Sequence, residues 1–389
     1  MRKKLKDVCM FYSGTGFPIQ YQGQTKGEYP FYKVGDIANN AIAGKIYLEL
    51  CNNYISSDVA KMIKGCILPK DTVVFAKIGE ALKLNRRAIT SCDCLIDNNA
   101  MGIAPKLDFL RIQYFYFCMK NLKMQTLAES TTVPSVRKTV LEKYEIEVPS
   151  LVEQEEIEKK LTLTQKIIEK RRQELSYLDE IIKARFVEMF GDYINEGGKP
   201  LSELATITGG LTKNSKRNTF NLKMPYLRVA NVFFNRLDLN EILEIGVRED
   251  EIGKTLLEAG DLLFVEGNGS IEQIGRVAIW DGSINQILHQ NHLIKARFHK
   301  KTILPEYALF YFMSQEGRQQ IISKSVSTSG LNTLSVNKIS SLILPMPPIE
   351  LQERFAAFVT QVNKSKVAVQ KALDETQILF DSLMQKYFG

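Results

Sequence analysis

The sequence predicts an α+β protein made of two tandem copies of one unit, each a globular module followed by a long helix. A proline turn, a Gln-Glu pair and an apolar rhythm occur twice, as PSLVEQEEIEKKL (149–161) and PPIELQERFAAFV (347–359). The two stretches align without a gap over about forty residues, which places Phe190 on Phe388. A repeat of this length indicates a duplicated structural unit rather than a short motif.

The similarity continues upstream of each proline turn, with offsets that drift as loops of unequal length would produce. LKDVCMFYSGTG corresponds to LSELATITGGLT, YPFYKVGDI to MPYLRVANV, LPKDTVVFAKIG to LEAGDLLFVEGNG, and DNNAMGIAPK to HQNHLIKARF. We therefore expect a first module at 1–152, a central helix at 153–190, a second module at 191–350 and a C-terminal helix at 351–389.

Both long helices carry apolar residues at alternating spacings of four and three, which predicts a coiled-coil seam. The apolar seam positions are Ile157, Leu161, Ile168, Leu175, Leu178, Ile182 and Met189 in the first helix, and Phe355, Val359, Val362, Val369, Leu373, Phe380, Leu383 and Tyr387 in the second. The alternative is that each helix packs only on its own module. About 38 residues at ~1.5 Å each span ~55 Å, more than a small domain, and this length favours the helix pair.

Each module is expected to combine short strands with one strong helix. β-rich runs bounded by turn residues occur at 72–79, 225–232, 261–267 and 275–280. Aromatic residues recur at helical spacing in 108–128 and 304–322, which is typical of helices packed on a core. After each of these helices comes a polar loop, ESTTVPSVRKT (129–139) or KSVSTSGLNTLSVNK (324–338), whose hydroxyl groups suit either plain turns or phosphate contacts. Its recurrence in both copies favours phosphate contacts.

Composition excludes several classes of protein. The 389 residues are 44% hydrophobic, and no run approaches the ~20 apolar residues of a membrane helix. No secretory signal is visible, so we expect a cytoplasmic protein with reduced cysteines. The spacing of the six cysteines fits no zinc motif. The net charge is +7; residues 1–152 hold 21 Lys and Arg against 14 Asp and Glu, whereas 191–350 hold 17 of each. This bias permits a polyanionic partner without requiring one.

With its tandem plan, its Ser/Thr loops and its repeated helix opening, the chain resembles a DNA specificity subunit of a type I restriction–modification system. The stretches that carry the resemblance are STTVPSVRKTVLEKYEIEVPSLVEQEEI and STSGLNTLSVNKISSLILPMPPIELQERF. The resemblance implies that each module is a target recognition domain for one half of a bipartite site in double-stranded DNA. It also implies an antiparallel helix pair with pseudo-two-fold symmetry. The second copy departs from the first at Leu351, where the first has Glu153, and we expect this to affect partner contacts more than the fold.

The resemblance further implies a noncatalytic role within a larger enzyme, a type I site-specific deoxyribonuclease and adenine methyltransferase. Two methyltransferase subunits and the restriction subunits would be the protein partners, and S-adenosylmethionine, ATP and Mg would bind to them. The chain itself shows no methyltransferase motif and no nucleotide-binding P-loop, and its glycine turns at 14–16 and 267–270 lack a strand–helix context. His289 and His292 have no third matching ligand, so a metal site is not expected. The alternative function is an orphan coiled-coil scaffold or regulatory protein of the same fold that has lost base reading.

Basic and hydroxyl residues near the polar loops are the candidate DNA contacts. In the first module they are Lys77, Lys83, Arg86, Arg87, Thr131, Thr132, Arg137 and Lys138; in the second they are Lys213, Lys216, Arg217, Arg228, Arg276, Ser327, Thr328 and Asn332. Arginine and asparagine can recognise base edges, whereas lysines and hydroxyls mostly hold the backbone.

Overall fold

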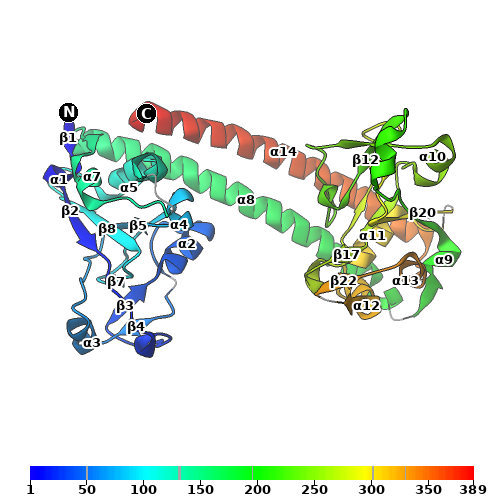
Figure 1. Cartoon of the computed structure of the whole chain (residues 1–389), viewed down its shortest axis with the longest axis horizontal. Helices are drawn as coiled ribbons and strands as arrows, with labels where there is room; N and C mark the ends of the chain where they lie inside the picture. The colour runs from blue at the N-terminus through cyan, green and yellow to red at the C-terminus, as the bar shows by residue number, and fades with distance from the viewer. Residues whose placement is uncertain (50, 130–132, 195, 300–301, 329) are drawn as a thin grey trace. The chain divides into compact units, whose positions relative to one another are not determined.

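The computed structural model describes residues 1–49, 51–129, 133–194, 196–299, 302–328 and 330–389. Two compact units result: Met1–Gln173 with Gln370–Gly389, and Glu174–Val369. Each unit is a module together with one end of each long helix, α8 (Leu151–Ile194) and α14 (Ile349–Phe388) (Figure 1). The predicted fold class, tandem α+β modules each followed by a long helix, is confirmed.

Both long helices begin two residues before the predicted positions 153 and 351. Ser150 caps α8: its hydroxyl accepts a hydrogen bond from the Glu153 N–H (3.3 Å), and the Glu153 carboxylate accepts one from the Ser150 N–H (2.9 Å). This reciprocal pair satisfies backbone donors that the first turn of a helix leaves free. The central helix also extends to Ile194, four residues beyond the predicted end.

The repeated glutamine of the two helix openings is a buried link between helix and module. The Gln154 amide nitrogen donates to the carbonyls of Phe109 (2.8 Å) and Pro149 (2.9 Å), and its oxygen accepts from the Arg111 N–H (2.9 Å). In the other unit the Gln352 amide donates to Thr302 (3.1 Å) and Pro347 (2.8 Å) and accepts from the Leu304 N–H (2.9 Å). Both glutamines are fully buried, so the repeat conserves an internal hydrogen-bond network.

The first module contains a four-stranded antiparallel sheet in the order β2-β8-β5-β6 and a smaller sheet in the order β4-β3-β7. A third, two-stranded sheet pairs β1 with β9. The strands are β1 (Arg2–Lys4), β2 (Cys9–Ser13), β3 (Tyr29–Tyr32), β4 (Tyr54–Ile55), β5 (Val73–Ala76), β6 (Arg87–Ile89), β7 (Leu95–Ile96), β8 (Ala100–Pro105) and β9 (Glu145–Glu147). The helices are α1 (Leu5–Val8), η1 (Ile19–Tyr21), α2 (Val34–Ile42), α3 (Ser57–Met62), α4 (Glu80–Lys83), α5 (Ile112–Asn121), α6 (Met124–Leu127) and α7 (Lys138–Lys143).

The second module repeats this plan with the sheets β11-β20-β16-β18, β15-β12-β19 and β10-β23, and adds the sheets β13-β14 and β17-β22-β21. The strands are β10 (Gly198–Pro200), β11 (Ala205–Gly209), β12 (Lys223–Leu227), β13 (Val232–Phe233), β14 (Arg236–Leu237), β15 (Leu243–Gly246), β16 (Leu262–Val265), β17 (Gly267–Asn268), β18 (Val277–Ile279), β19 (Leu288–His289), β20 (Leu293–Phe298), β21 (Val326–Thr328), β22 (Leu331–Thr333) and β23 (Ile343–Pro345). The helices are α9 (Leu201–Leu204), η2 (Ser215–Thr219), η3 (Val229–Asn231), α10 (Glu249–Thr255), η4 (Ile271–Gln273), α11 (Pro305–Met313), α12 (Gln315–Lys324) and α13 (Val336–Ser340).

Each strong module helix expected from the sequence is broken in two. In the second module the break is at Ser314, whose hydroxyl accepts the Gly317 N–H (3.3 Å) and so begins α12. A Cβ on Gly317 would lie 2.0 Å from the Tyr311 carbonyl oxygen, so this turn needs a glycine. The break between α5 and α6 in the first module falls at Leu122 and Lys123.

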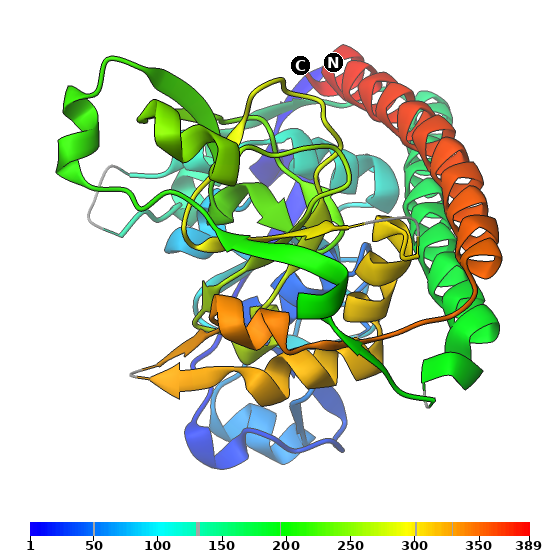
Figure 2. The same ribbon diagram turned by 90° about the vertical axis from the view of Figure 1, so that its right-hand side faces the viewer.

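Within each unit, the parts of α8 and α14 that belong to it run antiparallel and lie side by side (Figures 1 and 2). Within the second unit the rings of Phe186 and Phe355 are 5.5 Å apart, and Phe190 packs on both Phe355 (5.4 Å) and Tyr307 of α11 (4.7 Å). The seam residues predicted from the sequence are all buried or half-buried. The helices therefore pack on each other and on a module at once, and the sequence pattern missed the buried Phe186.

The alternating spacing of four and three also selects the polar residues Arg171 in α8 and Lys366 in α14, and each contacts the opposite helix. Within the first unit the Arg171 guanidinium donates to the Ala372 carbonyl and the Thr376 hydroxyl. Within the second unit the Lys366 ammonium pairs with Asp179 (2.5 Å). Polar pairs of this kind fix the register of two helices, at a cost in stability relative to an apolar seam.

Candidate nucleic-acid interface

In the first unit the Ser/Thr loop pairs with the loop that connects β5 to β6. The Val136 N–H donates to the Lys77 carbonyl (2.9 Å), and the Gly79 N–H donates to the Pro134 carbonyl (2.8 Å). These bonds bring two groups of candidate residues together, Lys77 to Arg86 on one loop and Arg137 with Lys138 on the other. Thr131 and Thr132 lie outside the described residues.

In the second unit the same two loops pair as strands. β17 and β22 place Asn268 opposite Asn332, and β21 places Ser327 opposite Asn332. The Asn332 amide donates to the carbonyls of Asn268 and Gly269 (3.3 Å each), so its nitrogen is used inside the protein while Ser327 is exposed. Thr328 ends β21, and its side chain lies outside the described part of the structure.

Three exposed candidate cations of the first unit, Lys83, Arg137 and Lys138, form surface ion pairs. Lys83 pairs with Glu80 (2.7 Å), and Arg137 pairs with Glu129 (2.8 Å). Lys138 lies 3.7 Å from the Glu142 carboxylate. Pairs of exposed side chains contribute little to stability, so these cations can exchange their carboxylates for phosphates at small cost.

The candidates of the second unit fall into two groups that no described contact joins. Lys213 and Lys216 are exposed in the segment before β12. Arg228 pairs with Glu241, and Arg276 donates to the Val229 carbonyl (3.4 Å), next to the paired loops. Burial lowers the pKa of Arg276.

Arg87 and Arg217 are inside the protein, which removes both from the set of exposed candidates. Arg87 is 3% exposed and donates to the Asn85 side chain (2.9 Å) and the Leu122 carbonyl (2.7 Å); burial lowers its pKa to about 10. Arg217 is 7% exposed and donates to the carbonyls of Thr212 (2.6 Å) and Gly246 (3.0 Å). The sequence gives no sign of this burial, because both residues occur in polar, cation-rich segments.

Arg217 also forms a two-pronged ion pair with Glu251 of α10, with N–O distances of 3.0 and 2.9 Å. The hydrogen bond from Arg217 holds the pKa of Glu251 below its usual value. Arg217 therefore ties the segment that carries Lys213 and Lys216 to α10 and to the end of β15.

The candidate DNA contacts chosen from the sequence did not include Arg236, an exposed arginine on β14 opposite Phe233. The available signal was its place in VFFNRL, where two aromatic residues and an asparagine turn precede an arginine.

The three histidines have separate surroundings. His289 is fully buried, with Nδ1 2.8 Å from the Thr255 carbonyl oxygen, and burial lowers its pKa to about 4. His292 Nδ1 lies 2.8 Å from the Glu266 carboxylate, and His299 is exposed. Among the described residues, no group of three or more His, Cys, Asp or Glu side chains could hold a metal ion.

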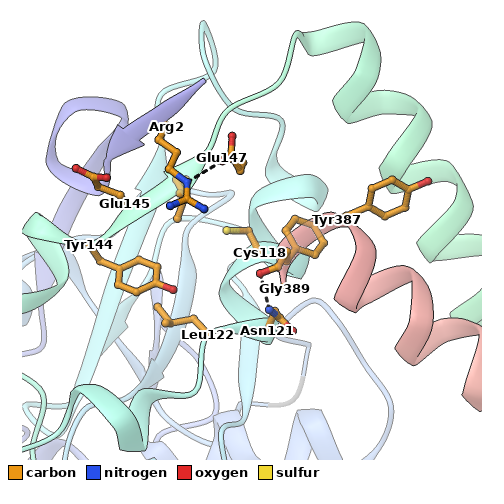
Figure 3. A pocket seen from close by; sticks show the side chains of 11 residues that line it. Arg2, Cys118, Asn121, Leu122, Tyr144, Glu145, Glu147, Tyr387 and Gly389 are labelled. Carbon is orange, nitrogen blue, oxygen red and sulfur yellow. Dashed lines mark hydrogen bonds and ion pairs between the residues drawn. The ribbon is translucent and has the colours of Figure 1, made fainter.

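A cavity of about 430 Å³ in the first unit lies where the end of α14 meets α5 and β9 (Figure 3). Its cation Arg2 points to Glu147 and donates to it (2.8 Å), and Glu145 also lines the cavity. Asn121 donates to the Phe388 carbonyl (2.9 Å). With its cation already neutralised and a second carboxylate present, this cavity is unsuited to a phosphate chain.

Within the described part of the chain, no helix is both long and apolar enough to cross a lipid bilayer.

Comparison with known protein families shows which family this chain belongs to. The model of the type I restriction modification DNA specificity domain matches residues 1–177 and again residues 198–376. The chain belongs to this family. The resemblance found in the sequence is thereby confirmed, and the two matches coincide with the two copies of the repeat.

Relatives and solved structures agree with this assignment. The type I restriction enzyme EcoKI specificity subunit of Escherichia coli (strain K12) is 26% identical over 294 residues, which cover 68% of this chain and 61% of that protein. The type I restriction enzyme MjaIX specificity subunit of Methanocaldococcus jannaschii is 22% identical over 99% of this chain and 91% of that protein. The chain thus spans less than two thirds of the EcoKI subunit but most of the MjaIX subunit.

Among solved structures, the type I restriction–modification S subunit from M. genitalium matches with a TM-score of 0.56 and 13% identity, over 100% of this chain and 96% of that one. A structure described under complex assembly and conformational transition of the type I R-M system matches with the same TM-score at 15% identity, over 100% of this chain and 97% of that one. At these identities the matches support the fold.

Proposed function

We propose that this chain is the noncatalytic subunit that gives a type I restriction–modification complex its DNA sequence specificity. The observation that carries the proposal is that the specificity-domain family matches twice, once in each copy of the repeat. Two copies of one recognition domain suit a bipartite target in double-stranded DNA, with one half-site bound by each unit. The methyltransferase and restriction activities would then belong to partner subunits.

The paired loops supply the chemistry that DNA binding needs. Exposed ammonium and hydroxyl groups hold phosphates, and guanidinium and amide groups can recognise base edges. The proposed contacts are Lys77, Lys83, Arg86, Arg137, Lys138, Lys213, Lys216, Arg228, Arg276 and Ser327. Arg87 and Arg217 are left out because their guanidinium groups are buried, and Asn332 because it is 8% exposed and its amide donates to the backbone.

We further propose that two methyltransferase subunits dock on the helix pair, with restriction subunits joining this core in the cytoplasm. The partners would supply the sites for S-adenosylmethionine, ATP and Mg. Ile181 and Leu379 occupy equivalent positions in the repeat, and both are exposed apolar side chains, at 47% and 53%. Large apolar residues at matching exposed positions of α8 and α14 suit two similar protein contacts.

The docking proposal predicts separable losses. Ile181→Asp and Leu379→Asp should each remove one methyltransferase from the complex, because each places a charge in one apolar contact. Native mass spectrometry of the assembled complex would measure the stoichiometry, with Glu375→Gln, a change at an exposed position of α14, as the control. Two methyltransferases retained by both variants would contradict the proposed positions, and a single methyltransferase on the unaltered chain would contradict the two-site model.

The DNA-binding proposal is tested by mapping methylated positions in DNA from cells that carry this chain with its partner subunits. We expect modified adenines within one bipartite sequence, and no such modification when the chain is omitted. Methylation that is unchanged without the chain, or that follows no sequence, would refute the specificity role.

A further inference from the structure

The two units share a frame but diverge directly after the first strand of their smaller sheets. In the first unit the Lys33 N–H donates to the Asp36 side chain (2.8 Å), and in the second the Arg228 N–H donates to the Asn231 side chain (2.9 Å). From this shared turn, the first unit continues as helix α2, which packs on β5 and β6. The second unit instead forms the hairpin β13–β14, which packs on the corresponding strands β16 and β18.

The hairpin displays an arginine on a phenylalanine ring. Phe233 and Arg236 are directly opposite each other in the ladder, and the Arg236 guanidinium lies 4.3 Å from the centre of the Phe233 ring. The turn between them is held by Asn235, whose φ is +47° and whose N–H donates to the Val277 carbonyl (2.9 Å). A planar guanidinium on an aromatic face is restricted in orientation before any ligand arrives.

A second arginine approaches the same ring. The Arg276 guanidinium lies 5.1 Å from the centre of the Phe233 ring, and its buried Nε has no hydrogen-bond partner in the part of the chain that the structure describes. Among the described residues, neither Arg236 nor Arg276 forms an ion pair with a carboxylate. Arg318, 5.0 Å from the Phe234 ring, is instead used structurally, since it donates to the Ile274 carbonyl (2.7 Å).

The segment that leads to the hairpin carries positive charges only. Residues 204–237 contain no Asp or Glu and six cations: Lys213, Lys216, Arg217, Lys223, Arg228 and Arg236. Of the three arginines, Arg217 and Arg228 are paired with carboxylates from later segments, whereas Arg236 is exposed and has no carboxylate partner among the described residues. Cations that a protein does not neutralise internally are available to a polyanion.

The hairpin is continuous with the paired loops of the second unit. Arg276 directly precedes β18, and its carbonyl accepts the Val265 N–H (2.8 Å) at the end of β16. The backbone carbonyl of the next residue, Glu266, accepts a hydrogen bond from the Leu334 N–H of the Ser/Thr loop (2.8 Å). Phe233, Arg236 and Arg276 are therefore connected, through the end of β16, to the strands that carry Ser327 and Asn332.

We propose that the hairpin β13–β14 is a DNA-contact element of the second unit and that Arg236 is its specificity-determining side chain. This proposal rests on the proposed function and adds a residue and a base class to it. The parallel N–H donors of a guanidinium match the O6 and N7 acceptors of guanine in the major groove, which is the commonest specific contact between arginine and DNA. Because the hairpin replaces α2 of the first unit, its readout would apply to one half-site only.

The test compares four chains in the assembled complex: unaltered, Arg236→Ala, Arg236→Lys and the control Arg248→Ala. Arg248 is another exposed arginine of the second unit, outside the hairpin. Binding to the mapped target and to duplexes with single substitutions in each half-site would be measured at several salt concentrations. We expect Arg236→Ala to weaken binding to the target about 10–100-fold and Arg248→Ala to change it little.

Arg236→Lys is the decisive variant, because it keeps the charge and removes the two-donor fork. We expect it to tolerate substitution at one position of the second half-site, to leave the first half-site unchanged and to keep the salt dependence of the unaltered chain. Equal weakening on every duplex by Arg236→Ala, with full sequence preference in Arg236→Lys, would make Arg236 a backbone contact and overturn the proposal. If the unaltered chain selects its target and both Arg236→Ala and Arg236→Lys bind it equally well, the proposal is also overturned. Absence of sequence preference in the unaltered chain would instead refute the proposed function.

Discussion

Replacing Arg217 by methionine is expected to destabilise the second unit by about 3 kcal/mol, because it removes the closest cation from the mostly buried Glu251 carboxylate. Glu251 would keep only the Arg248 N–H (3.0 Å) and the exposed Arg248 guanidinium at 3.8 Å. The Arg217 and Glu251 side chains are 9% and 19% exposed, and two hydrogen bonds join them. The change also removes donors from the carbonyls of Thr212 and Gly246. A chemically similar change at an exposed cation would have no such cost.

The only tryptophan of the chain makes this measurement specific to the second unit. Trp280 is 1% exposed and lies in a core cluster of that unit, so its fluorescence reports on the unfolding of that unit. Lys216→Met is the matched control, since Lys216 is the exposed neighbour of Arg217 on η2. We expect it to change the free energy of unfolding by less than about 0.5 kcal/mol and still to weaken DNA binding.

The double variant Arg217→Met/Glu251→Leu separates loss of the pair from loss of a partner. Because an apolar pair can replace a buried ion pair at little cost, it should recover part of the stability lost in Arg217→Met. Equal free energies of unfolding for Arg217→Met and Lys216→Met would show that the Arg217–Glu251 ion pair does not stabilise the second unit. The pair also depends on pH: Glu251, whose pKa is lowered in the folded state, stabilises at neutral pH, and this contribution is lost as the pH falls through the lowered pKa.

The repeat made the helix openings predictable from the sequence. A glutamine at the same position of two copies suggests one role, and both Gln154 and Gln352 bind three backbone groups within their own units. The spacing of apolar residues likewise indicated most of the buried helix positions. Phe186 escaped this pattern because the strict spacing selects Arg185, whereas the helix also packs on α11 through Phe186.

The candidate contacts were less predictable, because local composition does not show where a side chain points. Arg86 and Arg87 are adjacent, yet only Arg87 is buried, because it is the first residue of the fully buried strand β6 and Arg86 precedes that strand. In the sequence, Arg217 likewise cannot be told from its exposed neighbour Lys216. Arg217 differs because it pairs with Glu251 of α10, which lies 34 residues further along the chain. Arg236 lies on the hairpin β13–β14, where the first module has helix α2 instead, so comparison of the two copies could not reveal it.

The fully buried His289 predicts a specific acid sensitivity of the second unit. Burial lowers the pKa of His289 to about 4 in the folded chain, against about 6.5 in an unfolded one. As the pH falls from about 6.5 to about 4, the unfolded chain takes up this proton and the folded chain does not. The free energy of unfolding should therefore fall by about 3 kcal/mol over that range because of this one residue, and its contribution should not change further below it.

Substitution by asparagine tests this prediction, because the amide can still donate to the Thr255 carbonyl but cannot take up a proton. His289→Asn should lower stability at pH 7, since it leaves a small cavity, and should flatten the dependence of stability on pH between about 6.5 and 4. The prediction concerns the slope of the free energy of unfolding against pH, which the cavity does not change. This slope is measured by denaturant unfolding followed through Trp280 fluorescence.

The neighbours of His289 explain why the folded chain resists protonation there. Lys295, whose ammonium donates to the carbonyls of Lys254 and Leu256 (2.9 Å each), adds a repulsive charge. The hydrogen bond to the Thr255 backbone and the charge of Asp261 raise the pKa of His289, but burial, which lowers it, is the largest cause. His299→Asn is the control, because that imidazole is exposed and its loss should leave the slope unchanged. If His289→Asn keeps the slope of the unaltered chain, the acid sensitivity of this unit comes from other groups.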